Sequence, residues 1–301
     1  MKLSIIIVGY NTRDLAADCI RSIYENTSLR DISYEIILVD NASTDDSCDH
    51  IRSLYPDVKI IENATNLGFG RANNIGADAA TGEWLLLLNS DTTVTDTDFA
   101  TVLEAADGLS DTGAFSVKLL NTDGSPQCVG YDFPSIKREL KVNLLLSEFN
   151  FRKRRRLARR ADRGLHECDW VSGAFMLIRR DRFIQVGGFD DHIFMYSEDI
   201  DLCARLHAAG YTSYMLDTTA IVHHVRGSAQ NVDAPAGNRR GRTPGRPAAP
   251  RKPVTFKTLL GMKRNYYYVI RKNKLMRPLW FARVLGTINI FLLWIYKKIT
   301  S

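Results

Sequence analysis

The sequence predicts an α/β fold, in which a mostly parallel central sheet is flanked by helices. Over the first 90 residues, short apolar runs rich in β-branched residues alternate with helix-compatible segments. Each run is continuously apolar, which is typical of strands that are buried on both faces. Ligands bind at the carboxyl ends of such strands, so we expect the functional residues directly after each run.

The elements of the first half follow one another as strand and helix in turn. The expected strands span residues 3–9, 34–40, 58–62 and 84–89. The expected helices run from Thr12 to Tyr24, from about Thr44, and from Gly70 to Ala80. Ser43 or Thr44 is placed to cap the second of these helices, because both side chains can accept a backbone hydrogen bond.

The later elements are shorter. Residues 170–181, WVSGAFMLIRRD, predict a strand whose Gly173 lets the backbone lie close to a neighbour, followed by a short helix. Another helix begins near Glu198, because apolar residues then repeat at four-residue spacing and Gly210 follows its end. Residues 218–224, TTAIVHH, predict one more strand.

Two segments have a composition unlike that of the rest. Residues 137–164 are basic and helix-compatible, which predicts either a solvated helix or loop, or an arm that contacts a membrane or an anionic acceptor. The Gly, Pro and Arg after residue 228 exclude a packed core there. We therefore expect a folded domain over 1–228, a linker or flexible loop over 229–255, and a basic, aromatic-rich helical tail over 256–301.

The overall composition excludes several classes of protein. With 301 residues, 45% hydrophobic and 25% charged, the chain is neither a disulfide mini-protein, a collagen nor a wholly disordered protein. Its five cysteines are odd in number and scattered, so they indicate neither a disulfide framework nor a zinc knuckle. The first apolar run is too short for a signal peptide, and we expect a cytoplasmic protein.

The charge is unevenly distributed. Residues 226–301 contain 17 Lys and Arg against 1 acidic residue, whereas residues 1–225 contain 23 against 33. A basic tail indicates an anionic partner, and the apolar, aromatic-flanked run from Val284 to Tyr296 favours the inner membrane surface over nucleic acid. A helix of that length reaches about 20 Å against a hydrocarbon core of about 30 Å, so it would lie in the interface. The alternative is that it packs on the body or on a second copy of the chain, as in a homo-oligomer.

Polar residues follow the second and fourth strands. Asp40 and Asn41 end the second strand ahead of any cap position, and an Asp there is suited to accept a hydrogen bond from a ligand such as a base imide. Asp91 follows the fourth strand, where it either caps a helix or binds a hard cation that also binds substrate phosphates. A P-loop and a dinucleotide fingerprint are both absent, which excludes a P-loop nucleotide site and makes a Rossmann dehydrogenase a poor fit.

Acids and histidines complete the candidate site. Glu198, Asp199 and Asp201 lie at a helix start, where acids stabilise the helix dipole, and Asp201 can pair with Arg205. Three acids in four residues exceed what capping needs, so one of Glu198 or Asp199 is predicted to be a general base. His223 and His224 point to opposite faces of their strand, so one of the two can join Asp91 in a metal shell.

The motifs have a recognisable order, namely IIIVGYN, VDNASTD, NLGFGRANN, LLLLNSDT, SGAFMLIRR, GGFDDHIFMYSEDIDLCARLHAAGY and IVHH. Taken together, they resemble glycosyltransferase family 2 with the GT-A fold, and most of all its bacterial rhamnosyltransferase-like members that build surface polysaccharides. The resemblance covers residues 1–228.

The resemblance implies inverting transfer of a sugar, rhamnose from dTDP-rhamnose being favoured, from a nucleoside-diphosphate donor to a lipid-linked or polysaccharide hydroxyl. It implies Mg²⁺ or Mn²⁺ as the cofactor and a peripheral place on the cytoplasmic face of the inner membrane. A UDP-sugar donor stays open, as does a catalytically silent scaffold that binds a nucleotide-sugar or glycan. A nucleotidyltransferase would carry a Gly-rich signature near the first strand, which IIIVGYNTRD lacks.

The same resemblance assigns roles by residue. Asp199 matches the base that deprotonates the acceptor, with Glu198 beside it as the second catalytic acid, and Asp91 and His223 match metal ligands. The donor would contact the following residues: Gly9, Tyr10, Asn11, Asp40, Asn41, Arg71, Asn89 and Ser90. One departure is that Asn89 stands in place of the first carboxylate of the family's metal motif.

Overall fold

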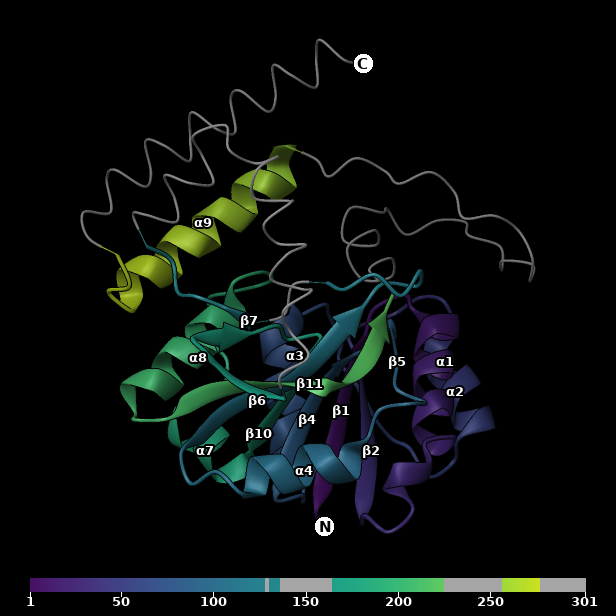
Figure 1. Ribbon diagram of the computed structural model, residues 1–301. Coiled ribbons are helices and arrows are strands. Elements are labelled where there is room, and N and C mark those ends of the chain that lie inside the picture. The colour runs from purple at the N-terminus through teal and green to yellow at the C-terminus, as the bar shows by residue number, and fades with distance from the viewer. Residues whose placement is uncertain (128–129, 136–163, 225–255, 277–301) are drawn as a thin grey trace.

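The α/β class is confirmed by the computed structural model, in which a central sheet lies between two layers of helices (Figure 1). The structure describes residues 1–127, 130–135, 164–224 and 256–276. The strands are β1 (Leu3–Gly9), β2 (Tyr34–Asp40), β3 (Lys59–Glu62), β4 (Trp84–Asn89), β5 (Thr92–Thr93), β6 (Thr112–Leu120), β7 (Gly130–Tyr131), β8 (Leu165–Cys168), β9 (Trp170–Val171), β10 (Phe175–Arg179) and β11 (Thr212–His223). The helices are α1 (Arg13–Tyr24), the 3₁₀ turn η1 (Thr27–Leu29), α2 (Ser47–Leu54), α3 (Phe69–Asp78), α4 (Phe99–Asp107), α7 (Arg180–Gln185), α8 (Glu198–Ala208) and α9 (Phe256–Lys272).

The core explains why the first strands are apolar throughout. Side chains alternate between the two faces of a strand, so Ile5 and Ile7 of β1 face α1, α2 and α4, whereas Ile6 faces α3, α7 and α8. All three isoleucines are fully buried. Full burial of such a side chain stabilises the fold by roughly 1.5–3 kcal/mol. A strand with a helix layer on each side therefore favours apolar residues at most positions, and the buried Ser4 of β1 is hydrogen-bonded to Glu35 and Gly82.

The sheet is parallel in its first half and mixed in its second. Among the described residues the strand order is β3-β2-β1-β4-β10-β6-β11-β5, with β8 also paired to β11, and β7 pairs with β9 in a separate two-stranded sheet. The first four strands are parallel, as expected, but β10 runs antiparallel to both β4 and β6. The expectation of a mostly parallel sheet therefore holds for the first half only, because β10 begins at the end of the sheet where β4 finishes.

Residues 170–181 form two strands instead of the single strand that the sequence predicts. β9 pairs with β7, and β10 joins the main sheet, so the chain changes sheets at Ser172–Ala174. Gly173 does provide the expected close approach, because a Cβ built there would lie 3.2 Å from the ring of Phe69.

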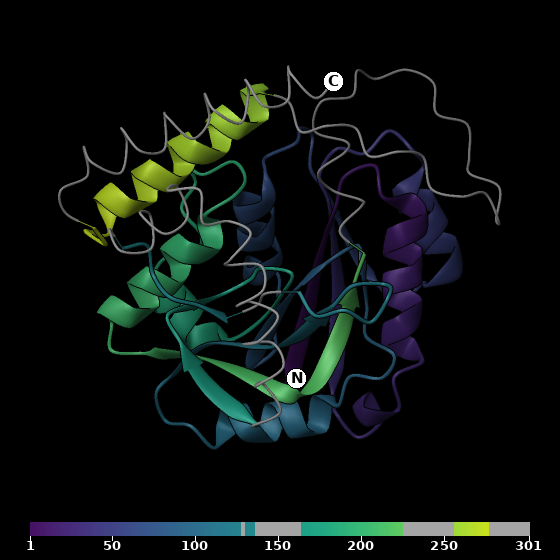
Figure 2. The same cartoon turned by 45° about the horizontal axis from the view of Figure 1, so that its top comes forward.

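The carboxyl ends of β1, β2 and β4 point to the face of the molecule opposite the N-terminus, where α9 also lies (Figures 1 and 2). Of the tail expected over 256–301, the part that the structure describes begins with helix α9. Three expected features lie outside the described residues, namely the apolar run from Val284 to Tyr296, the basic segment up to residue 163, and the linker over 229–255. In the described part of the chain, no helix is long and apolar enough to cross a bilayer.

Candidate active site

Asp91 and His223 meet at the end of β4. The chain turns after Asn89 and forms β5, which pairs antiparallel with β11 so that Thr92 lies opposite His223. This register places His223 Nε2 3.3 Å from Asp91 Oδ1. His224 faces the other way and contacts Thr93 Oγ1 at 2.9 Å. The expectation that one histidine of the pair joins Asp91 agrees with this geometry.

Gln127 fixes the orientation of the His223 ring, and the sequence analysis missed it. Gln127 Nε2 donates to His223 O at 2.8 Å and to Asn121 Oδ1 at 3.0 Å, so its Oε1 faces His223 Nδ1 at 3.0 Å. A carbonyl oxygen can only accept, and therefore Nδ1 carries a proton. In the neutral tautomer with the proton on Nδ1, Nε2 would direct its lone pair at Asp91.

Two electron-pair donors that face each other at 3.3 Å fit a bound cation. Ligands about 2.1 Å from one ion, at a right angle, lie about 3.0 Å apart. The side chains of Asp91 and His223 are at most 15% exposed. The amide nitrogen of Asn89 lies 3.3 Å from His223 Nε2. The described residues contain no group of three or more His, Cys, Asp or Glu that could hold a metal alone. Diphosphate oxygens and water would complete such a shell.

Asp40 offers one unpaired oxygen to a ligand. Its Oδ2 accepts a hydrogen bond from the Ser43 backbone at 2.8 Å, whereas Oδ1 is buried without a partner in the described part of the chain. A buried carboxylate oxygen left in this state is unfavourable unless a ligand donates to it. This is the observation expected of a residue that recognises a base imide.

Ser43 and Thr44 do not cap a helix, which corrects the expectation from local sequence. Helix α2 begins three residues later, after Asp46. The Asn11 backbone instead donates to Ser43 Oγ at 2.8 Å, and Asn11 Oδ1 accepts from the Thr44 backbone at 2.8 Å. Asn11 adopts a left-handed conformation, with φ at 52°. These bonds join the turn after β1 to the turn after β2.

The other residues expected to contact the donor occupy varied surroundings. Asn41 is buried and hydrogen-bonded to the protein, donating to Asn66 Oδ1 at 2.9 Å and accepting from Leu67 N at 3.0 Å. Arg71 is half exposed and lies 3.9 Å from Asp191. Gly9 lies against Thr12, Ser90 is buried in the turn after β4, and Tyr10 is partly buried beside Asn11. Donor contact by all of these residues stays a prediction.

Glu198 and Asp199 begin α8 at the edge of the same region. The Asp199 carboxylate accepts from the Ile200 backbone at 2.9 Å and is also stabilised by the Gly173 backbone N–H. The next residue, Ala174, accepts a hydrogen bond from Asn89 at 3.1 Å. The strip from Gly173 to Ala174 therefore connects the acids of α8 with the end of β4.

The two carboxylates differ from ordinary surface acids. Burial raises the pKa of Asp199. Burial and the neighbouring Asp199 charge raise the pKa of Glu198, whose Oε2 is buried without a partner in the described residues. A carboxylate with a raised pKa takes up a proton more readily near neutral pH, as a general base requires. Asp201 is fully buried and pairs with Arg205 at 2.8 Å, which confirms its structural assignment.

Cys19 of α1 lies beneath the turn that follows β4. Its Sγ is 3.6 Å from Asn89 O and 3.5 Å from Thr92 Oγ1, and burial raises the pKa of the thiol to about 12. It is therefore an uncharged packing group and not a nucleophile.

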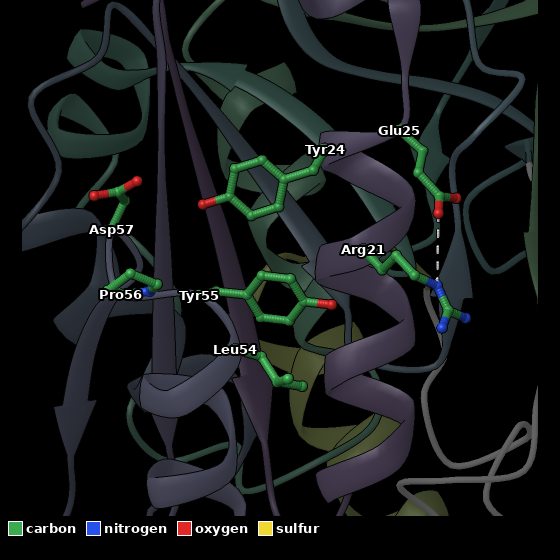
Figure 3. Close-up of a pocket in the computed structure, with 7 residues that line it drawn as sticks. All are labelled: Arg21, Tyr24, Glu25, Leu54, Tyr55, Pro56 and Asp57. Carbon is green, nitrogen blue, oxygen red and sulfur yellow. Dashed lines mark ion pairs between the residues drawn. The ribbon is translucent and has the colours of Figure 1, made fainter.

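A surface groove lies elsewhere. Figure 3 shows the stacked rings of Tyr24 and Tyr55, with centroids 5.5 Å apart, beside the ion pair of Arg21 with Glu25. It is formed at the carboxyl ends of α1 and α2. These helices run opposite to the strands they connect, so the groove lies toward the amino ends of β2 and β3, whereas Asp91 follows the carboxyl end of β4.

The fold is that of GT-A glycosyltransferases. A crystal structure of GalNAc-T7 with UDP, GalNAc and Mn²⁺ superimposes with a TM-score of 0.57 at 17% identity, over 75% of this chain and 44% of that chain.

A family model described as Glycosyl transferase family 2 matches residues 4–200, and the chain belongs to this family. It is 32% identical over 203 residues to an N-acetylglucosaminyl-diphospho-decaprenol L-rhamnosyltransferase of Mycobacterium tuberculosis, covering 63% of this chain and 66% of that protein. It is 29% identical over 230 residues to rhamnosyltransferase WbbL of Escherichia coli K12, covering 73% of this chain and 82% of WbbL. The chain thus spans just under two thirds of the length of the first relative.

Proposed function

We propose that the protein is an inverting glycosyltransferase that moves rhamnose from dTDP-rhamnose to a hydroxyl of a lipid-linked or polysaccharide acceptor in cell-surface glycan synthesis. The observation that carries this proposal is an arrangement of three side chains around the strip from Gly173 to Ala174. Asp91 pairs with His223 on one side of this strip, and Asp199 lies on the other. Two of the relatives are named as rhamnosyltransferases, which supports the choice of sugar.

The chemistry follows from where the charges lie. Asp40 Oδ1 would accept from the pyrimidine imide, and Asp91 and His223 would hold the Mg²⁺ or Mn²⁺ ion. When bound, that ion neutralises the negative charge of the leaving diphosphate. Asp199 takes the proton of the acceptor hydroxyl, whose oxygen bonds to the anomeric carbon as the bond from that carbon to the diphosphate oxygen breaks. A single displacement inverts the anomeric centre.

A peripheral position on the cytoplasmic face of the inner membrane belongs to the same proposal. The basic segment over 226–301 suits a surface of anionic lipids. The acceptor named for the Mycobacterium tuberculosis relative is linked to decaprenol, a lipid. A lipid-linked acceptor would be met at that surface.

The test is transfer by the purified full-length protein with Mg²⁺ or Mn²⁺. Nucleoside diphosphate release and glycan product are measured across a panel of dTDP-, UDP- and GDP-sugars with lipid-linked acceptors. We expect turnover with dTDP-rhamnose, its loss in Asp199→Asn and Asp91→Ala, and no loss in Asp49→Asn, whose side chain is 85% exposed. Turnover of a UDP-sugar alone would correct the donor. Donor binding without turnover of any sugar would favour a silent scaffold.

A further inference from the structure

The segment from Gly187 to Ser197, here called the acid loop, leads directly into Glu198 and Asp199. Helix α3 holds one side of it. Asn74 Nδ2 donates to Phe189 O at 2.9 Å, and Asn74 Oδ1 accepts from Phe189 N at 2.8 Å. The Phe69 backbone donates to Phe194 O at 3.0 Å. These three hydrogen bonds fix the acid loop to helix α3.

Helix α9 holds the other side, although it comes some 60 residues later in the sequence. Both views place α9 alongside α8 and above it (Figures 1 and 2). Asn265 Nδ2 donates to Met195 O at 2.8 Å, and the Tyr268 hydroxyl donates to Asp190 Oδ2 at 2.8 Å. Val269 is fully buried against Ile193 and Ile200.

Lys272 joins the acid loop to helix α8. Its Nζ lies 2.6 Å from Asp190 Oδ2 and 3.0 Å from the Asp201 carboxylate. Burial opposes ionisation of Asp190, but the Lys272 ammonium and further hydrogen-bond donors hold its pKa well below the usual range. Asn273 Nδ2 donates to Asp201 Oδ1 at 2.8 Å. Asp201 is fully buried, so it depends on these donors and on Arg205.

The loop needs such support because its last residues are strained. Tyr196 and Ser197 both adopt left-handed conformations, with φ at 70° and 76°, immediately before Glu198. Two consecutive residues with side chains persist in that region only where their surroundings hold them there.

We propose that α9 acts as a clasp on the acid loop and that Lys272 is a positioning residue for transfer, an inference that rests on the proposed function. Lys272 touches no reacting atom. By bridging Asp190 and Asp201 it holds the strained turn that aims Asp199 at the acceptor. The family match ends at residue 200, so this support lies outside the matched segment.

The test compares Lys272→Met with Arg271→Met in the full chain. Arg271 is the adjacent basic residue, is exposed, and has no side-chain partner among the residues that the structure describes. We expect Lys272→Met to lower kcat by about 10- to 100-fold through misplacement of Asp199, with the KM for the donor nearly unchanged. Lys272→Arg should restore part of the loss, and Arg271→Met should match the wild type.

Hydrogen–deuterium exchange of residues 187–201 gives a second readout, independent of turnover. Lys272→Met should speed exchange there and leave exchange in β1 and β4 unchanged. If Lys272→Met does not fold, Tyr268→Phe decides, since it loses only the hydroxyl that binds Asp190. Wild-type kcat and exchange in the folded variants would overturn the clasp. If the wild type transfers no sugar, the proposed function fails, while exchange alone decides on the clasp.

Discussion

Asp199 is the base in the proposed reaction, and its raised pKa has a consequence for the reaction rate. The base must be ionised to take a proton, so the transfer rate should rise with pH as this carboxyl ionises. We expect the acid limb of the kcat profile to lie above the ordinary aspartate pKa of about 3.9. Measurement of kcat from pH 4 to 9 with one donor tests this. An acid limb near pH 4 would contradict it.

Glu198 should make the fold less stable as pH rises. The pKa of its carboxyl is raised in the folded state, so between its unfolded and folded pKa values the folded protein binds more protons. Its contribution to stability is present below that interval and is lost as pH rises through the folded pKa. At pH 8 to 9, Glu198→Gln should raise the free energy of unfolding by on the order of 1 kcal/mol.

Denaturant unfolding at pH 5 and pH 9 measures this effect. The matched variant is Glu104→Gln, because Glu104 is exposed on α4. It should change the free energy of unfolding equally little at both values of pH. If Glu198→Gln is no more stable than the wild type at pH 9, ionisation of the Glu198 carboxyl does not destabilise the fold.

Gln127 should affect metal affinity without touching the metal. Gln127→Leu leaves the His223 ring free to turn and to protonate either nitrogen. Loss of such a partner typically weakens metal binding by about 10- to 100-fold. Titration of free Mn²⁺ by electron paramagnetic resonance, with a nucleoside diphosphate present, measures it. Gln185→Leu, at an exposed position of α7, is the control. Unchanged Mn²⁺ affinity in Gln127→Leu would contradict the assignment.

At the scale of the elements, the sequence predicts the first four strands because each is a continuous apolar run, a local signal. The bonds of Ser43 and Thr44 to Asn11 could not be predicted from local capping rules, since they cross from one turn to another. Gln127 gave no signal either, because a lone glutamine in a loop shows its role only when β11 brings His223 beside it.

Gly68 joins α3 to the acid loop through backbone contact. It has φ at 85°, and a Cβ built on it would lie 2.1 Å from Phe194 O. Gly68→Ala should therefore displace the loop, destabilise the fold by about 1–3 kcal/mol, and lower transfer. Gly210→Ala is the matched control, since Gly210 has φ at 92° and nothing within 4 Å of its Cβ. Thermal unfolding and kcat of the two variants separate the clash from the backbone strain that both share. Equal effects would mean that the contact with Phe194 is unimportant.

At the scale of the whole molecule, the site is assembled from both halves of the chain. Asp40 and Asp91 follow strands of the parallel half, whereas His223 ends β11 in the mixed half. The sequence indicated these residues because each follows a strand or begins a helix. It could not give the order of β10, β6 and β11, since pairing between distant segments leaves no mark in local periodicity.

The uneven charge predicts how the protein meets a membrane. The basic segment over 226–301 should bind vesicles that contain phosphatidylglycerol, more weakly as salt rises, and bind phosphatidylcholine vesicles poorly. Co-sedimentation at two salt concentrations measures this. Changing Arg239, Arg240 and Arg242 to Gln should reduce binding without changing the transfer rate to a water-soluble acceptor. Equal binding to both lipids would contradict the electrostatic part of the proposal.

The buried thiol of Cys19, beneath the turn after β4, can report how often that turn opens. A thiol reagent can reach Cys19 only when that turn lifts away from α1, so the rate of its modification counts those openings. A nucleotide and cation bound on the outer side of the turn should make the openings rarer. Cys168, which is only partly buried and lies away from this turn, is the comparison thiol. Occupancy of the site can thus be followed by mass, residue by residue, with no sugar transferred.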